Sequence, residues 1–324
     1  MSKWKAVIPI VAILLIGVAC SSGGGLNSEC DSAIFIDHVI LDTPVELGTI
    51  VMPGTHFTKT WRVQNDGDCT WTTDYDLVQV AGSSFSAVEE HPLAIEVDPG
   101  ESVDISLSLT APSESGSHRG EWMLRNAEGD TFGVAASGEA PLITEFQVAD
   151  LAPGVVYEFD QVHCLAVWHS NLATFLPCDG GEDEEDPRIG YVRLVADASL
   201  EDNNPNNSSV IEVKPNNQDG GWINGIFPPI TIHSGDHFLA EVGCLAENPD
   251  CSIIFQLEYQ REDGSLSRLG EWQQLQDREA SSINIDISEL AGESIRFILR
   301  VEENGGRSLQ GIGYWLDARI ERAD

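Results

Sequence analysis

The chain has 324 residues, with 17 Lys and Arg against 53 Asp and Glu and a formal net charge of −36. So negative a chain, with no basic stripe, is excluded from binding nucleic acid through phosphate neutralisation. Apolar residues make up 42% of the chain, with 8 Trp and 11 Phe, which is too much for a disordered acidic protein. The length and composition therefore predict one to three domains with packed cores.

The N-terminus has the layout of an export signal. Lys3 and Lys5 precede an uncharged run from Ala6 to Ala19. As a helix this run would cover about 21 Å, short of the ~30 Å hydrocarbon core that a membrane span must cross. We therefore expect residues 1–19 to be a cleaved signal peptide.

Small residues stand before Cys20, and a Ser/Gly spacer follows it. This pattern resembles the lipobox of bacterial lipoproteins, which implies that Cys20 becomes a diacylglycerol-modified N-terminus. Residues 20–29 would then be the lipidated cysteine and a flexible tether, and the protein would be anchored to the membrane at the cell surface. An uncleaved anchor or plain secretion is the alternative, and in every case the body of the protein lies outside the cytoplasm.

Assigning Cys20 to lipid leaves an even number of cysteines, as expected of an exported chain. Pairing each with its neighbour keeps every bridge inside one proposed domain, although other connectivities remain open. The expected disulfides are Cys30–Cys69, Cys164–Cys178 and Cys244–Cys251. Since no C-x₂-C spacing and no paired histidines occur at zinc-finger distance, no structural zinc is expected.

Residues 30–138 consist of short alternating runs separated by Pro-Gly, Asp-Gly and Glu-Gly turns. From Val103 to Leu109, apolar residues alternate with Asp and Ser, as a strand with one buried face requires. Helical periodicity is absent. The pattern predicts an antiparallel sandwich rather than an α/β enzyme scaffold.

Five short stretches of this region carry a specific resemblance. They are Pro53–Asn65, Gly67–Trp71, Val97–Glu101, Gly120–Trp122 and Phe132-Gly133. They are similar to the four-tryptophan Ig-like domain found in an autophagy receptor and in many bacterial extracytoplasmic proteins. That resemblance implies an Ig-like sandwich that serves in protein docking or spacing, without catalysis. After Phe132-Gly133, where the family usually has a fourth Trp, this chain continues Val-Ala-Ala.

Tryptophans on alternating strands can each bury 150–250 Å² of surface. Trp61, Trp71 and Trp122 are therefore expected in the core of this domain.

Residues 139–153 contain Pro141 and lead to Pro153-Gly154, which predicts a linker. From 154 to 324 a second β region follows, with alternating runs around Phe255–Tyr259 and Ile295–Val301. Its layout is similar to jelly-roll, galactose-binding-like modules. The predicted fold class is all-β, an Ig-like β-sandwich followed by a jelly-roll-like β-sandwich.

No catalytic constellation is evident. The chain has no G-x-S-x-G elbow for a serine nucleophile and no H-E-x-x-H for a metalloprotease. Pairs of carboxylates carry no glycosidase signal, because 53 acidic residues allow any pair to be drawn. We expect no enzyme activity and no cofactor.

Two acidic loops, Gly181–Asp186 and Glu201–Asn207, could supply oxygen ligands to a structural calcium ion. Neither matches the D-x-[DN]-x-[DN]-G loop, and an ordinary solvated loop is the alternative for each. No metal site is assigned.

Trp222, between Gly-Gly and Ile-Asn-Gly, and Trp272, which follows Gly-Glu, lie in loop-like contexts. Trp168 and Trp315 are more typical of strand residues. An exposed ring with polar neighbours can stack on the apolar face of a sugar, so Trp222 and Trp272 are the candidate ligand-binding residues. Packing at the edge of the core is the alternative for both. The expected partner is an extracellular glycan or protein. The alternatives are a structural or protein-assembly role in the cell envelope and, further off, a hydrolase accessory or an enzyme.

Overall fold

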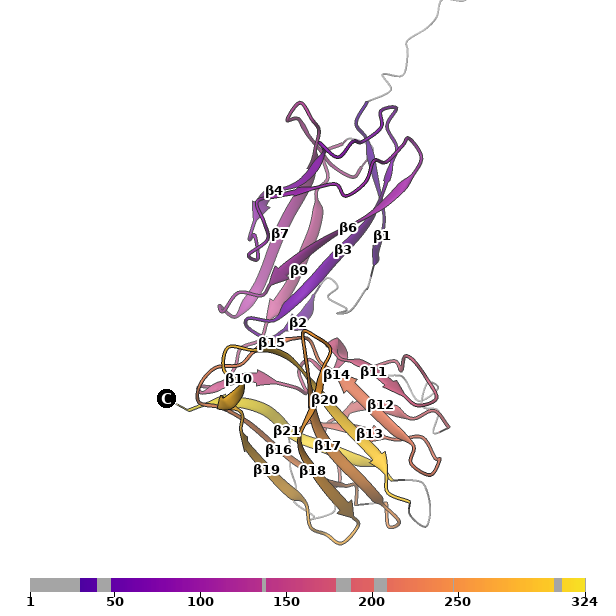
Figure 1. The fold of residues 1–324 in the computed structure, drawn as a ribbon, viewed down its shortest axis with the longest axis vertical. Helices are drawn as coiled ribbons and strands as arrows, with labels where there is room; N and C mark the ends of the chain where they lie inside the picture. The colour runs from indigo at the N-terminus through magenta and orange to yellow at the C-terminus, as the bar shows by residue number, and fades with distance from the viewer. Residues whose placement is uncertain are drawn as a thin grey trace, which may run out of the picture.

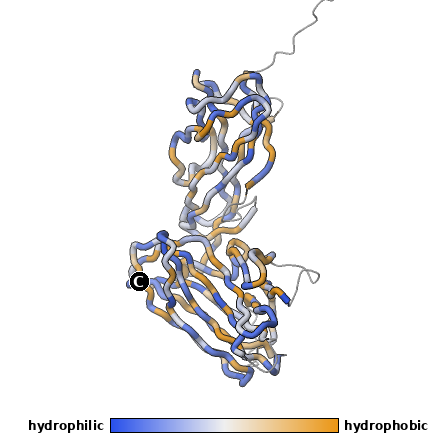
Figure 2. The backbone as a smooth tube through the Cα atoms, turned by 45° about the vertical axis from the view of Figure 1, so that its right-hand side comes forward, coloured by the Kyte–Doolittle hydropathy of each residue, from blue (hydrophilic) through white to orange (hydrophobic). Residues whose placement is uncertain are grey.

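The structure, a computed structural model, describes residues 30–39, 48–135, 138–178, 188–200, 209–246, 248–305 and 311–323. Within these ranges the chain forms two β-sandwich modules stacked end to end (Figure 1). Polar and apolar residues intermix along the strands of both modules, as Figure 2 shows, so each sheet can turn one side toward its partner sheet. The predicted fold class is confirmed.

Nine strands form the first module. They are β1 (Ala33–Val39), β2 (Thr49–Val51), β3 (His56–Asn65), β4 (Asp76–Gly82), β5 (Glu90–Pro92), β6 (Ser102–Thr110), β7 (Gly116–Arg125), β8 (Thr131–Phe132) and β9 (Leu142–Val148). Among the described residues, one sheet has the order β1-β3-β6 and the other the order β2-β9-β7-β4-β5, with β8 paired to β7. The predicted alternation in β6 is present, because its four apolar side chains are all buried.

Aromatic side chains fill the space between these two sheets. Trp61, Trp71 and Trp122 are each at most 2% exposed. The Trp122 ring lies 5.7 Å from that of Trp61 and 6.1 Å from that of Phe85, measured between centroids. Gly120 makes room for the indole, since a Cβ at that position would lie 2.4 Å from Trp122 Cη2. The three tryptophans are therefore packing residues of this module.

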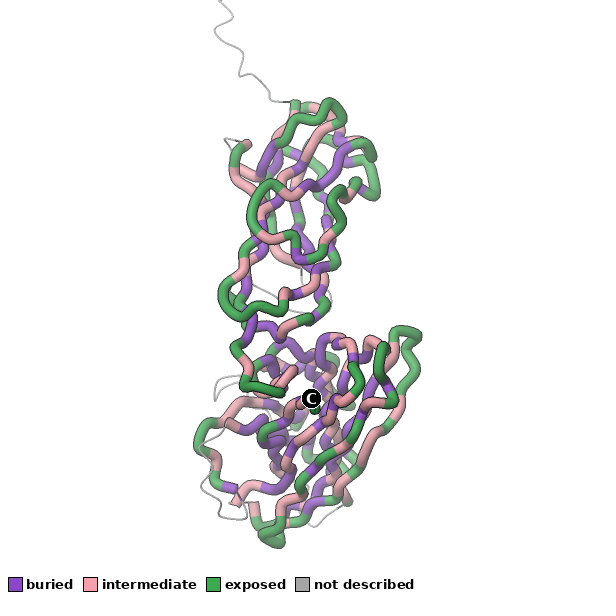
Figure 3. Tube along the Cα trace, turned by 90° about the vertical axis from the view of Figure 1, so that its left-hand side faces the viewer, coloured by how far each residue is buried: buried purple, intermediate pink, exposed green. Residues whose placement is uncertain are grey.

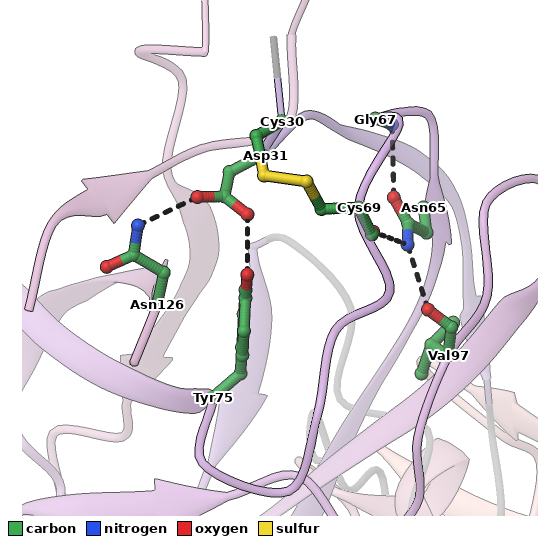
Figure 4. Close-up of a disulfide and its surroundings, with 8 residues drawn as sticks. All are labelled: Cys30, Asp31, Asn65, Gly67, Cys69, Tyr75, Val97 and Asn126. Atoms are coloured by element: carbon green, nitrogen blue, oxygen red, sulfur yellow. Dashed lines mark hydrogen bonds between the residues drawn. A yellow bond between two sulfur atoms is a disulfide. The ribbon is translucent and has the colours of Figure 1, made fainter. Parts of the chain in front are cut away.

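The entry of the chain into the first module is fixed by the Cys30–Cys69 disulfide and by Asp31 beside it (Figure 4). The Asp31 carboxylate accepts hydrogen bonds from the Tyr75 hydroxyl at 2.8 Å and from Asn126 Nδ2 at 2.7 Å. Burial, together with the neighbouring carboxylate, raises the pKa of Tyr75 to about 12. The Asp31 carboxylate thus connects the segment before β1 to two loops of the opposite sheet.

We expect Asp31→Ala to lower the free energy of unfolding by about 1–3 kcal/mol, because it leaves the buried Tyr75 hydroxyl without its acceptor. Urea unfolding followed by far-UV circular dichroism measures this change. Asp31→Asn, which keeps an oxygen acceptor, should lose less. Equal stability of Asp31→Ala and the wild type would show that the hydrogen bonds contribute nothing.

The second module begins at β10 and contains twelve strands among the described residues. They are β10 (Val155–Glu158), β11 (Val167–Ser170), β12 (Tyr191–Val195), β13 (Val210–Lys214), β14 (Trp222–Ile226), β15 (Ile230–Thr231), β16 (Asp236–Cys244), β17 (Ser252–Arg261), β18 (Leu266–Leu275), β19 (Ser281–Asp286), β20 (Ser294–Glu303) and β21 (Gly313–Arg322). One sheet has the order β12-β13-β21-β16-β19, with β10 beside β21. The other has the order β11-β14-β20-β17-β18, with β15 beside β20.

A group of phenylalanines holds these two sheets together. Phe159 meets Phe227, Phe238 and Phe297 in edge-to-face geometry, with centroids 4.8, 5.4 and 5.6 Å away. Edge-to-face contacts between buried rings are favourable beyond the area that they bury. Figure 3 shows buried residues running through the interior of both modules.

The three predicted disulfides are confirmed. Cys164 bonds to Cys178 and Cys244 to Cys251 in the second module, as Cys30 does to Cys69 in the first. Disulfides are typical of proteins that fold in an oxidising compartment, so they support a location outside the cytoplasm.

The boundary between the modules differs from the sequence-based prediction of a linker over 139–153. Seven of those residues form β9, which pairs with β7 and β2 and so belongs to the first module. The connection itself runs from Ala149 to Gly154. Beside it, Met52 is fully buried, and the backbone N–H of Glu158 donates to its sulfur at 3.4 Å. The modules therefore pack directly against each other.

Several predicted features lie outside the described residues, namely the signal peptide, Cys20 with its tether, and the two acidic loops Gly181–Asp186 and Glu201–Asn207. In the described part of the chain, no helix has both the length and the apolar composition needed to cross a membrane.

Candidate ligand-binding face

The side of the sheet β11-β14-β20-β17-β18 that points away from the core is here named the outer face. The strand registers place five of its side chains in one row across the sheet. The row is His169, Asn224, Arg300, Gln256 and Glu271. Since neighbouring strands are about 4.8 Å apart, the row is roughly 19 Å long. That length suits an extended ligand better than a single small molecule.

Aromatic rings gather at the β11 end of the outer face. Trp222 begins β14 and is partly exposed, and the His169 ring meets it edge-on with centroids 5.4 Å apart. Beyond β11, Leu176 forms a bridge to Trp168 and points into the core, so Phe175 points the opposite way and is 68% exposed. Phe175, His169 and Trp222 therefore form a ring-rich edge on this face.

His169 is held in its neutral form. Burial lowers its pKa, and the positive charge of Arg300 lowers it further. At neutral pH this side chain therefore acts as an uncharged ring with one hydrogen-bond donor and one acceptor.

Arg300 fixes the position of the Trp222 ring. Its guanidinium lies 4.6 Å from the centroid of the indole, within cation–π range. The same group donates to Asn224 Oδ1 at 3.2 Å and to the Glu302 carboxylate at 2.8 Å. Because Arg300 covers one side of the indole, a ligand would stack on the other side.

The β17–β18 end of the outer face is polar and preorganised. Arg268 donates to Glu258 and to Gln256 Oε1, each at 3.0 Å, and it also donates to Glu271. Gln256 in turn donates to Glu271 at 3.1 Å. Hydrogen-bonding groups held in place in this way are what recognition of hydroxyl groups requires.

Ion pairs offset most of the charge at the centre of the outer face. Glu302 pairs with Arg300, while Glu258 and Glu271 pair with Arg268. On a chain of net charge −36, a face on which two arginines pair with three acids is close to neutral. It favours an uncharged, hydroxyl-rich ligand over a polyanion or a polycation.

The structure separates the two tryptophans that the sequence paired as candidates. Trp222 lies on the outer face, whereas Trp272 lies opposite Phe255 on the inner side of β18 and packs against the core. The neighbouring glycine explains the difference, since a Cβ at Gly270 would lie 2.3 Å from Trp272 Cη2. The Gly-Glu before Trp272 is thus part of a strand that accommodates the indole, and no loop is present there.

Sequence reasoning missed Phe175, His169, Asn224 and Arg300 as members of this face. His169 is predictable as the outward neighbour of the strand residue Trp168, once β11 is known to lie beside β14. Phe175 gave no signal, because its orientation depends on the chain turning back along β11.

No candidate metal centre arises from His163, Cys164 and Cys178, although their ligand atoms cluster within 4.8 Å. The two sulfurs form a disulfide, so neither can act as a thiolate ligand.

Comparison with known proteins gives a family for the first module. Residues 44–137 match the family described as the Ig-like domain from next to BRCA1 gene. The protein ILRUN of Danio rerio is 35% identical over 107 residues, covering 33% of this chain and 36% of that protein. Protein JOKA2 of Solanum tuberosum is 30% identical over 128 residues, covering 39% and 14%. The predicted Ig-like resemblance is confirmed, and the chain spans about a third or less of the length of these relatives.

Solved structures of low similarity include β-sandwich carbohydrate-binding modules. The structure of TmCBM61 in complex with β-1,4-galactotriose is 12% identical. The match covers 48% of this chain and 88% of that one, with a TM-score of 0.31. A second structure comes from work on the promiscuous specificity of carbohydrate-binding modules of the β-sandwich superfamily. It is 9% identical, the match covers 90% of this chain and 98% of that one, and the TM-score is 0.32. Likenesses this remote assign no ligand to this chain.

Proposed function

We propose that the second module binds an extracellular glycan on its outer face, without catalysing a reaction. The observation that carries this proposal is the partly exposed Trp222 ring, held by Arg300 beside His169 and Asn224. A partly exposed indole can stack on the apolar face of a sugar, and the fixed amides and carboxylates nearby can bind its hydroxyl groups.

We further propose that the protein is a cell-surface lipoprotein. In this proposal Cys20 carries the lipid, residues 20–29 form the tether, and the Ig-like module acts as a spacer or docking unit between the membrane and the glycan-binding module. The three disulfides and the signal-like N-terminus support this arrangement.

Replacing Trp222 by alanine is expected to weaken glycan binding about 30-fold, equivalent to about 2 kcal/mol, because the stacking surface is lost. The measurement is affinity electrophoresis in gels containing neutral xylan, galactan, mannan or hydroxyethylcellulose, followed by calorimetric titration with the polysaccharide that retards the wild type. Trp272→Phe is the matched control, since its ring lies on the inner side of the same sheet. Failure of the wild type to bind any of the four, or unchanged binding by Trp222→Ala, would contradict the proposal.

A protein-assembly role is the second candidate, favoured by one observation. In the described structure, β1 is an edge strand that pairs only with β3, and Ile34, Phe35 and Ile36 are 39%, 37% and 47% exposed. An edge strand with exposed apolar side chains is a template for adding a strand from another chain.

A further inference from the structure

A groove runs between the two modules. One part, with a volume of about 630 Å³, lies between His56 of the first module and the residues around Arg296 and Gln260 of the second. An adjoining part of about 270 Å³ continues along the ends of β3 and β6 and shares His56, Pro229 and Arg296 with the first. Figure 1 shows β2 above β15 at this junction. Clefts between domains are preferred places for ligands.

Strand β20 connects the groove with the outer face, because its residue Arg296 lines the groove. Arg296, Ile298, Arg300 and Glu302 are the alternate residues of β20 on this side of the sheet, with Ile298 buried between the two arginines. Arg296 lies opposite Gln260 in the register. Trp222 lies opposite Glu302 at the far end of the same strand. Six residues at about 3.4 Å each separate Glu302 from Arg296, so the path from Trp222 to the groove is roughly 20 Å long.

The walls of the groove suit a hydroxyl-rich chain. On the side of the first module, His56 Nδ1 lies 2.9 Å from Thr110 Oγ1, and Thr58 and Ser108 also line the groove. On the other side, Gln260 and Ser294 offer polar groups, and Pro229 offers an apolar surface. Arg261 is already held by Glu293 at 2.5 Å and by the Tyr259 hydroxyl at 2.9 Å, so its charge is balanced locally. Glu262 and Arg296, which also line the groove, carry opposite charges, so the groove has little net charge and favours uncharged ligands.

We propose that this groove is a second subsite for the glycan bound at Trp222, so that the first module contributes directly to binding through His56. The inference rests on the proposed function of the outer face. It predicts that only chains long enough to extend from Trp222 into the groove contact both modules. The Ig-like module then does more than separate the membrane from the ligand, because it completes the site.

The test compares oligosaccharides of two lengths on the full chain. Trimers and hexamers of β-1,4-linked xylose, glucose, mannose and galactose are titrated calorimetrically into the wild type and into His56→Ala, Gln260→Ala and Trp222→Ala. Loss of about one hydrogen bond predicts that His56→Ala and Gln260→Ala each weaken hexamer binding about fivefold and leave trimer binding unchanged. Trp222→Ala should weaken both lengths. His91→Ala, on β5 and outside the groove, is the matched control and should bind as the wild type does.

The possible failures are distinguishable. If Trp222→Ala weakens binding while His56→Ala binds hexamer as the wild type does, the groove is no subsite and only the present inference is overturned. If His56→Ala weakens trimers and hexamers equally, the length dependence is wrong and the inference is again overturned. If neither length binds the wild type, the proposed function fails and the inference fails with it.

Discussion

Replacing Lys214 by methionine should lower the free energy of unfolding by about 3 kcal/mol at pH 8 and by far less at pH 5. Lys214 and Glu303 are 6% and 3% exposed, on opposite sheets of the second module. Each lysine or glutamate buried in this way needs a countercharge. Burial raises the pKa of the Glu303 carboxyl, while the hydrogen bond from the Gly311 N–H and the charge of the Lys214 ammonium lower it. Removing the ammonium leaves a buried carboxylate that still accepts a hydrogen bond from the Gly311 N–H at 2.9 Å.

The pH dependence follows from the direction of each pKa shift. Burial raises the pKa of Glu303 from its ordinary value to about 7, so the folded state binds its proton more tightly than the unfolded chain does. The stability gained from that proton is complete below about pH 4.5 and is lost as the pH rises through 7. Without Lys214 the pKa of Glu303 rises further, and the loss extends to higher pH. Burial also lowers the pKa of Lys214, so at pH 5, beside a neutral Glu303, methionine should cost little.

Urea unfolding at pH 5, 6, 7 and 8 measures this effect. The double variant Lys214→Met/Glu303→Gln removes both charges and is expected to show a flatter profile than either the wild type or Lys214→Met. Parallel stability profiles for Lys214→Met and the wild type would show that the two charges do not interact.

The sequence predicted the fold class because its strongest signals are local. Alternation of apolar and polar residues is legible in β6, β17 and β20, and turn residues mark most of their ends. The disulfides could also be predicted, because after Cys20 each bridge joins two consecutive cysteines of the sequence. The strand pattern depends on neighbouring residues alone, and the disulfides depend only on the order of the cysteines in the sequence.

The errors concern features that depend on tertiary packing. Pro141 suggested a linker, yet Leu142, Phe146 and Val148 alternate inward from β9, which completes the first module by pairing with β2 across the sequence. For Trp272, the Gly-Glu before it suggested a loop, although the indole covers Gly270 and leaves no room there for a Cβ. Neither could be resolved without knowing which strands are neighbours.

The candidate site was half predictable for the same reason. Trp222 stood out by residue type, but the residues around it come from β11 and β20 and from the segment after β11. Their assembly is set by strand order, which no local pattern in the sequence specifies. The groove at His56 was further out of reach, because it exists only where two modules meet.

Replacing Trp122 by alanine is expected to lower the free energy of unfolding of the first module by about 3–5 kcal/mol. The ring is 2% exposed and contacts Trp61 and Phe85, and Gly120 beneath it leaves the site unable to close over the cavity without moving the backbone of β7. Trp122→Phe, which keeps part of the aromatic surface, should cost less than half as much.

Urea unfolding monitored by far-UV circular dichroism measures the free energy of unfolding of both variants. The urea concentrations are spaced closely enough to resolve one transition for each module. Without urea, where the variant is folded, Trp122→Ala should still bind trimeric oligosaccharide with the affinity of the wild type. Trimer binding is assigned to the outer face around Trp222. Unchanged stability combined with lost binding would mean that Trp122 contacts a ligand, and the assignment of this tryptophan to the packed interior would then be wrong. The two readouts together therefore separate a tryptophan that holds a sandwich closed from one that holds a sugar.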